Sequence, residues 1–84
     1  MTWTVYILEC ADATLYTGIS NNMAERLEKH ANGTGAKYTR GRGPYKVVYQ
    51  ETFKSRGDAT KREIAIKALG RAEKLSLARI YLQD

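Results

Sequence analysis

The segment from Tyr16 to His30 constrains the fold more than any other stretch of this sequence. It reads YTGISNNMAERLEKH, which combines the end of a strand, a glycine turn and the beginning of a helix. Asn22 is a good helix N-cap and is followed three residues later by a glutamate, the spacing of a capping box. Two different elements therefore bring side chains into one small space. The side chains with chemistry to offer are Tyr16, Arg26 and His30.

Three segments have the β-branched and aromatic composition of strands. Residues 3–10 carry apolar side chains at both odd and even positions, which is typical of a central strand covered on both faces. Residues 14–17 resume the strand pattern after a short polar turn, so these two segments are expected to pair as an antiparallel hairpin. Gly18 is expected to end the second strand, and residues 46–53 form the third.

The first helix is expected to begin near Asn22 and to bury an apolar stripe of residues four apart. That stripe consists of Met23, Leu27 and Ala31. Arg26 and His30 are also four residues apart, on one flank of the stripe. They should therefore point the same way, beside the core.

Two more helices follow the last strand. Ser55 with Asp58 again has capping-box spacing, and Glu63 lies in the middle of the second helix. The residues expected to face inward from this helix are Ala59, Ile64 or Ala65, Ala68 and Leu69. The last helix, from residue 71 to about residue 82, is expected to bury Ala72, Leu75, Leu77 or Ala78, and Leu82. The order of elements predicts an α+β fold in which a small three-stranded antiparallel sheet is flanked by about three helices.

The length and charge restrict the class of protein. Eighty-four residues suffice for one domain, spanning 1–84, and a net charge of +5 favours a polyanionic partner, of which nucleic acid is the commonest. Cys10 is the only cysteine, so an intramolecular disulfide is excluded and Cys10 is expected in the core. No apolar run is long enough to span a bilayer and the N-terminus lacks a secretion-signal pattern, so a cytoplasmic protein without membrane contact is expected.

Residues 32–45 form a long loop that contains four of the seven glycines and the only proline. Loops of this length in a compact domain are usually functional or disordered. Its basic and aromatic side chains are candidates for contact with a phosphate backbone: Lys37, Tyr38, Arg40 and Arg42. A solvated loop with incidental charge is the alternative interpretation.

Two tyrosine motifs are followed by three polar residues at defined spacings. Thr4-Val5-Tyr6 is followed ten residues later by Tyr16-Thr17-Gly18, counted from tyrosine to tyrosine. Arg26 lies ten residues after the second tyrosine, His30 one helical turn later, and Glu63 on a later helix. In order and spacing this pattern resembles the GIY-YIG nuclease superfamily, most closely its small stand-alone bacterial members, and the resemblance covers essentially the whole chain.

The resemblance implies a metal-dependent endonuclease that hydrolyses phosphodiester bonds in DNA. Glu63 would hold one divalent ion, Mg²⁺ or Mn²⁺, and Tyr6 would be the general base. Arg26 offers a charged fork matched to phosphate, and His30 could accept or relay the proton of the tyrosine. Tyr16 would orient the water or the phosphate by hydrogen bonding. Taken singly, each of these side chains has an ordinary packing or surface explanation, and their joint order favours the site.

Three positions depart from the family pattern, and the first is Thr4, which replaces the first glycine of the Gly-Ile-Tyr motif. Ile19 follows Gly18 where some branches have a lysine, and Leu75 stands where many members have an asparagine, with Lys74 and Ser76 beside it. A second hypothesis is therefore a nucleic-acid-binding module of the same fold that cuts weakly or not at all. A third is a small oligomerising protein whose charge is incidental. DNA is favoured over RNA, with branched or single-stranded forms as candidate substrates, and the oligomeric state is left open.

Overall fold

A computed structural model describes residues 2–32 and 43–82 of the chain. Its elements are β1 (Trp3–Glu9), β2 (Leu15–Ser20), α1 (Met23–Ala31), β3 (Lys46–Phe53), α2 (Arg56–Lys67) and α3 (Arg71–Leu82). The predicted α+β fold, with three strands and three helices in this order, is confirmed. Both predicted caps form: Asn22 Oδ1 accepts from the backbone N–H of Glu25 at 3.1 Å, and Ser55 Oγ from that of Asp58 at 3.1 Å.

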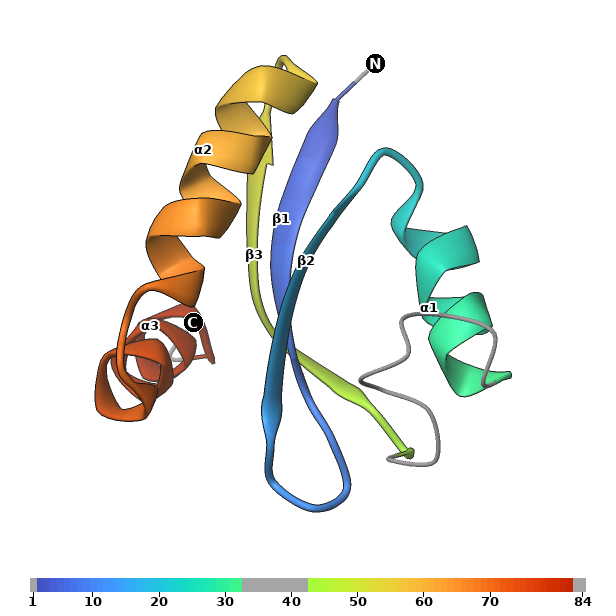
Figure 1. Cartoon of the computed structure of the whole chain (residues 1–84). Coiled ribbons are helices and arrows are strands. Elements are labelled where there is room, and N and C mark those ends of the chain that lie inside the picture. Colours follow the sequence, from blue (N-terminus) through green and yellow to red (C-terminus); the bar gives the residue numbers. More distant parts are fainter. Residues whose placement is uncertain (1, 33–42, 83–84) are drawn as a thin grey trace.

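The sheet has the strand order β2-β1-β3, and both pairs of neighbours are antiparallel. β1 is the central strand, as predicted, and its residues from Val5 to Leu8 are fully buried. Helix α1 lies on one face of the sheet, whereas α2 and α3 lie on the other (Figure 1). β2 is an edge strand of this sheet, so within the described residues one of its sides has no neighbouring strand.

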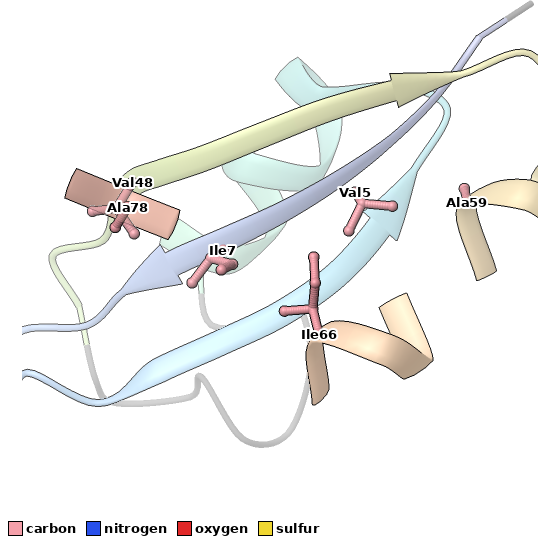
Figure 2. Packing of buried hydrophobic residues seen from close by; sticks show 6 residues of the cluster. All are labelled: Val5, Ile7, Val48, Ala59, Ile66 and Ala78. Carbon is pink, nitrogen blue, oxygen red and sulfur yellow. The ribbon is translucent and has the colours of Figure 1, made fainter. Parts of the chain in front are cut away.

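The apolar core lies between the sheet and the helices α2 and α3. Figure 2 shows its buried members, which are Val5, Ile7, Val48, Ala59, Ile66 and Ala78. Alternate residues of β1 point to this face, so Tyr6 and Leu8 point to the opposite face, toward α1. In the described parts of the chain, no helix is both long enough and apolar enough to cross a membrane.

Helix α2 buries a different stripe from the one predicted. Ala59 and Ile66 are buried, whereas Ile64 is 62% exposed and Ala65 and Ala68 are also exposed. The prediction for these three residues was therefore wrong, while Leu69 is partly buried as expected. The buried stripe follows positions 59, 63 and 66, which lie on one helical face. Glu63 consequently lies on the face turned toward the sheet.

Helices α1 and α3 also present other faces than predicted. In α1 the buried residue is His30, while Ala31 is exposed and its partners in the expected stripe are only partly buried. Helix α1 turns the flank that carries Arg26 and His30 to the sheet. In α3, Ala78 is buried, but the predicted inward residues Ala72, Leu75 and Leu82 are exposed. This helix packs mainly on β3, so only a narrow stripe around Ala78 is covered.

Candidate active site at the edge of strand β2

Gly18 makes room for the ring of Tyr6. The two residues are paired across β1 and β2, and β2 continues to Ser20, so the prediction that Gly18 ends the strand was wrong. A Cβ atom at position 18 would lie 2.7 Å from Tyr6 Oη and 2.9 Å from its Cζ. The glycine therefore lets the tyrosine lie flat across β2, with its hydroxyl directed to the strand edge.

The hydroxyl of Tyr6 is held by two side chains of α1. Arg26 Nε donates a hydrogen bond to Tyr6 Oη at 3.3 Å, and His30 Nε2 lies 3.1 Å from the same oxygen. A guanidinium has no acceptor, so the oxygen accepts from Arg26. The phenolic O–H can then donate to His30 Nε2 when that nitrogen carries no proton. The sequence predicted that Arg26 and His30 point the same way, and the structure confirms it.

Aromatic rings enclose His30, which is 1% exposed. Tyr16 packs edge-on against the imidazole, with 5.4 Å between ring centroids, and its ring lies 6.3 Å from that of Tyr6. Tyr45, just before β3, adds a third ring at 5.9 Å from His30. The sequence analysis did not identify Tyr45, because no local pattern shows that residues 30 and 45 are neighbours. The four predicted residues of β1, β2 and α1 therefore share one site.

Burial controls the protonation of this cluster. It raises the pKa of Tyr6 above 10, against the opposing hydrogen bond from Arg26, and the nearby charges of Tyr16 and Glu63 raise it further. Burial also lowers the pKa of His30 below 6.5, and the positive charge of Arg26 adds to this effect. Near neutral pH the site therefore holds a neutral phenol beside a neutral imidazole. Such an imidazole can accept a proton.

Glu63 acts on this site from the other face of the sheet. Helix α2 packs on β2 as well as on β1, and the Glu63 side chain is 17% exposed. Its carboxylate is close enough to Tyr6 to raise the pKa of the phenol. Lys67, one turn later on α2, forms an ion pair with it at 3.5 Å. β2 is thus contacted by helices from both faces, by α2 through packing and by α1 through His30 against Tyr16.

The carboxylates near the site suit a hard divalent cation only if it is bound in one particular way. Among residues 2–32 and 43–82, no three His, Cys, Asp or Glu side chains form a group that could hold a metal. Mg²⁺ keeps several water ligands and needs only one or two carboxylates together with substrate phosphates. A single, largely buried carboxylate facing the site suits that binding mode. Glu63 is therefore a fitting ligand for a metal that arrives with water and phosphate.

The structure shows which cation lies beside the tyrosines. Ile19, which follows Gly18, is apolar and packs against the core on the α2 side, so it supplies no charge there. Arg26 contributes the charge instead. Arg26 also lines a hollow of about 220 Å³ with Lys29 and the end of β2. The predicted nucleic-acid contacts Lys37, Tyr38, Arg40 and Arg42 lie outside the described residues and stay predictions.

Comparisons with known proteins agree with this geometry. The family model of the GIY-YIG catalytic domain matches residues 2–76. A UPF0213 protein of Clostridium perfringens is 56% identical over 73 residues, which cover 87% of this chain and 78% of the relative. A UPF0213 protein of Oceanobacillus iheyensis is 50% identical over 80 residues, which cover 95% and 93% of the two chains.

Solved structures resemble the whole fold. The solution NMR structure of a UPF0213 protein from Bacillus halodurans has a TM-score of 0.62 at 45% identity, covering 95% of this chain and 85% of the other. The solution NMR structure of a protein from E. faecalis has a TM-score of 0.65 at 34% identity, covering 100% of this chain and 91% of the other.

Proposed function

The chain belongs to the GIY-YIG nuclease superfamily, and on that premise we propose that it is a metal-dependent endonuclease that hydrolyses phosphodiester bonds in DNA. The observation that carries this proposal is the Tyr6 hydroxyl, held at 3.3 Å by the guanidinium of Arg26 and at 3.1 Å by the imidazole of His30. A neutral phenol between a permanent cation and a proton acceptor can transfer a proton next to a bound phosphate.

In the proposed mechanism, Tyr6 passes a proton on without first becoming a phenolate. The attacking water gives its proton to Tyr6 Oη, while the phenolic proton moves to His30 Nε2. This relay agrees with the raised pKa of Tyr6, because no ionised tyrosine has to exist before the reaction. It also agrees with the lowered pKa of His30, which keeps the imidazole ready to accept a proton near neutral pH.

Arg26 and Tyr16 position the phosphate and the water in this proposal. The guanidinium offers several N–H donors in a fixed fork; its Nε–H donates to Tyr6, and it also hydrogen-bonds with the side chain of Tyr16. Its charge would also stabilise the extra negative charge of the transition state. Tyr16 borders the same space with its ring edge-on to His30. Its hydroxyl would orient the water or a phosphate oxygen.

Glu63 would hold one Mg²⁺ or Mn²⁺ ion together with water and substrate oxygens. When bound, such an ion supplies positive charge to the phosphate and to the leaving oxygen. The ion pair with Lys67 would have to open for this; its N–O distance is 3.5 Å, and the Lys67 side chain is 53% exposed and can turn toward water. Cys10 is a free thiol, which suits a reducing compartment, and we propose the cytoplasm as the site of action.

A nucleic-acid-binding module that does not cut is the second candidate. Glu63 pairs with Lys67 as a purely structural carboxylate would. Neither Ile19 nor Leu75 brings a polar group to the positions where many relatives have one. This candidate predicts binding of nucleic acid that weakens steeply with salt, without metal-dependent turnover.

Cleavage assays on matched variants separate the two candidates. The purified chain is incubated with single-stranded, nicked, branched and duplex DNA, and with RNA, in Mg²⁺, Mn²⁺ or a chelator. Glu63→Gln and Tyr6→Phe are expected to lower the metal-dependent rate by about 100-fold or more. The controls Glu28→Gln and Tyr81→Phe remove the same chemical groups from exposed helix positions and should leave the rate unchanged. Equal trace cleavage by the wild type and Glu63→Gln would reject the nuclease proposal.

A further inference from the structure

Two adjacent hollows follow the unpaired side of β2 below the candidate site. One has a volume of about 380 Å³ and is lined by Leu15, Tyr16, Thr17, Lys67 and Lys74. The other has a volume of about 170 Å³ and is lined by Thr14, Leu15, Arg71 and Lys74. Both hollows are lined by Leu15 and Lys74, so they are neighbours along β2. We call the two hollows together the α3 groove.

Among the described residues, the charged side chains that line the α3 groove are all basic. They are Lys67 from the end of α2, which is paired with Glu63 at 3.5 Å, and Arg71 and Lys74 from the first turn of α3. Glu73, the acidic residue of that turn, instead accepts from the backbone N–H of Gly70 at 3.4 Å. The groove therefore suits an anion, and basic side chains in two neighbouring hollows suit more than one anionic group.

Tyr16 connects the groove to the reacting groups. It lines the groove and also packs against the rings of His30 and Tyr6. Beyond the tyrosines, the hollow that contains Arg26 and Lys29 follows the other half of β2. The candidate site thus has a hollow on each side along β2, and in the second one Arg26 and Lys29 lie together with Glu25, to which Lys29 is paired at 3.1 Å.

We propose that the α3 groove binds the sugar–phosphate backbone of one nucleic-acid strand on one side of the bond to be cut, with Lys74 and Arg71 contacting its phosphates. The proposal rests on the proposed function, because it places the scissile phosphate beside Tyr6 and Arg26. The groove follows four successive residues, Thr14–Thr17, which span about 13 Å of extended chain. One row of cations of that length matches one backbone strand, so a single strand or an unpaired end is the preferred ligand.

The same proposal explains the position where relatives have an asparagine. Leu75 is 36% exposed and does not line the groove, whereas its neighbour Lys74 is partly buried and lies beside Tyr16. Lys74 is therefore the α3 side chain that faces the site. Its long aliphatic stem can pack against Leu15 while the ammonium group meets phosphate.

Binding measurements in a variant that does not cut test this inference apart from catalysis. In the Glu63→Gln background, a labelled single-stranded oligonucleotide is titrated at several salt concentrations. Lys74→Gln with Arg71→Gln should weaken binding on the order of tenfold at low salt and reduce the log–log salt slope by about 1.4, or about 0.7 for each lost phosphate contact. Lys54→Gln with Lys61→Gln removes the same charge from exposed residues outside the groove and should change affinity less than about twofold.

The outcomes separate this inference from the proposed function. If the groove pair and the control pair lose affinity equally, or if the protein binds no single strand at low salt, the groove proposal is rejected. If the wild type never cuts but the groove pair alone weakens binding, the nuclease proposal fails and the groove proposal stands. Thermal unfolding of each variant shows whether a loss reflects a folding defect, and Lys74→Met, which retains the aliphatic stem, repeats the test if Lys74→Gln unfolds.

Discussion

At the scale of single residues, the site depends on one hydroxyl group and its surroundings. Tyr6 Oη accepts from Arg26 and lies within hydrogen-bond distance of His30, and Gly18 is the residue that leaves space for it. Burial keeps both the phenol and the imidazole neutral by shifting their pKa values in opposite directions. Each contact has a measurable consequence.

Gly18→Ala should disturb the tyrosine without disturbing the backbone. The added methyl group would lie 2.7 Å from Tyr6 Oη and 3.0 Å from a ring carbon of Tyr16, and the Tyr6 ring is fully buried and cannot move far. We expect the free energy of unfolding to fall by about 1–3 kcal/mol, as measured by chemical denaturation. Gly57→Ala is the control, because its methyl group would meet only Ser55 Oγ at 4.0 Å. Equal stability of the two variants would contradict the close approach at Gly18.

The lowered pKa of His30 should make stability depend on pH. Below pH 6.5 the unfolded chain binds a proton at this residue, whereas the folded protein still keeps it neutral. The free energy of unfolding is therefore expected to decrease as the pH falls from about 6.5 toward 5. His30→Gln should flatten this part of the curve when denaturation is measured across the range. Identical slopes in the two proteins would show that His30 titrates normally.

At the scale of elements, helix α2 connects the core to the site. Ala59 and Ile66 hold it against the sheet, and Glu63 lies between them on the same helical face. The register of the helix therefore decides that the carboxylate turns inward. If Ile64 were the buried residue, Glu63 would be rotated away from that face.

Two isoleucines of α2 test this register directly. Ile66 is fully buried, so Ile66→Ala should lower the free energy of unfolding by about 2–5 kcal/mol. Ile64 is 62% exposed, so Ile64→Ala should change it by less than about 0.5 kcal/mol. Urea denaturation of both variants gives the comparison. A larger loss for Ile64→Ala would contradict the orientation of the helix.

At the scale of the whole molecule, the active groups gather at an edge of the sheet. α1 lies on one face of the sheet and α2 on the other (Figure 1); α2 packs on β2, and His30 of α1 packs against Tyr16 of β2. Part of the net charge of +5 lies at this edge, because Lys67 and Lys74 line the hollow beside Tyr16, and Arg26 and Lys29 line the other hollow together with Glu25. A strand of phosphates is the ligand that would meet most of them at once.

Binding of a single-stranded oligonucleotide should therefore depend strongly on salt. Four described cations, Arg26, Lys67, Arg71 and Lys74, predict a log–log slope of about −3 at about 0.7 for each contact. A steeper slope that returns to this value in a variant with Lys37, Arg40 and Arg42 replaced by alanine would assign further contacts to residues 37–42. A slope near zero would contradict an electrostatic mode of binding altogether.

Much of the fold could be predicted from the sequence because its signals are local. The caps at Asn22 and Ser55, the composition of the strands and the spacing of Arg26 and His30 act within a few residues of chain. The inward faces of α2 and α3 could not be predicted this way, since Ile64, Leu75 and Leu82 are as apolar as the residues that are buried. Which of them loses contact with water depends on where the sheet lies.

The features of the candidate site can likewise be divided into those determined by the sequence and those decided by the tertiary structure. The sequence by itself determined which side chains can act, because their chemistry and order are properties of the chain. Only the tertiary structure decided that Gly18 lies within a strand under Tyr6, that Tyr45 joins the rings around His30, and that Lys74 rather than Leu75 faces Tyr16. It also decided the pKa shifts of Tyr6 and His30, because burial and neighbouring charge arise from residues far apart in the chain that pack together only on folding.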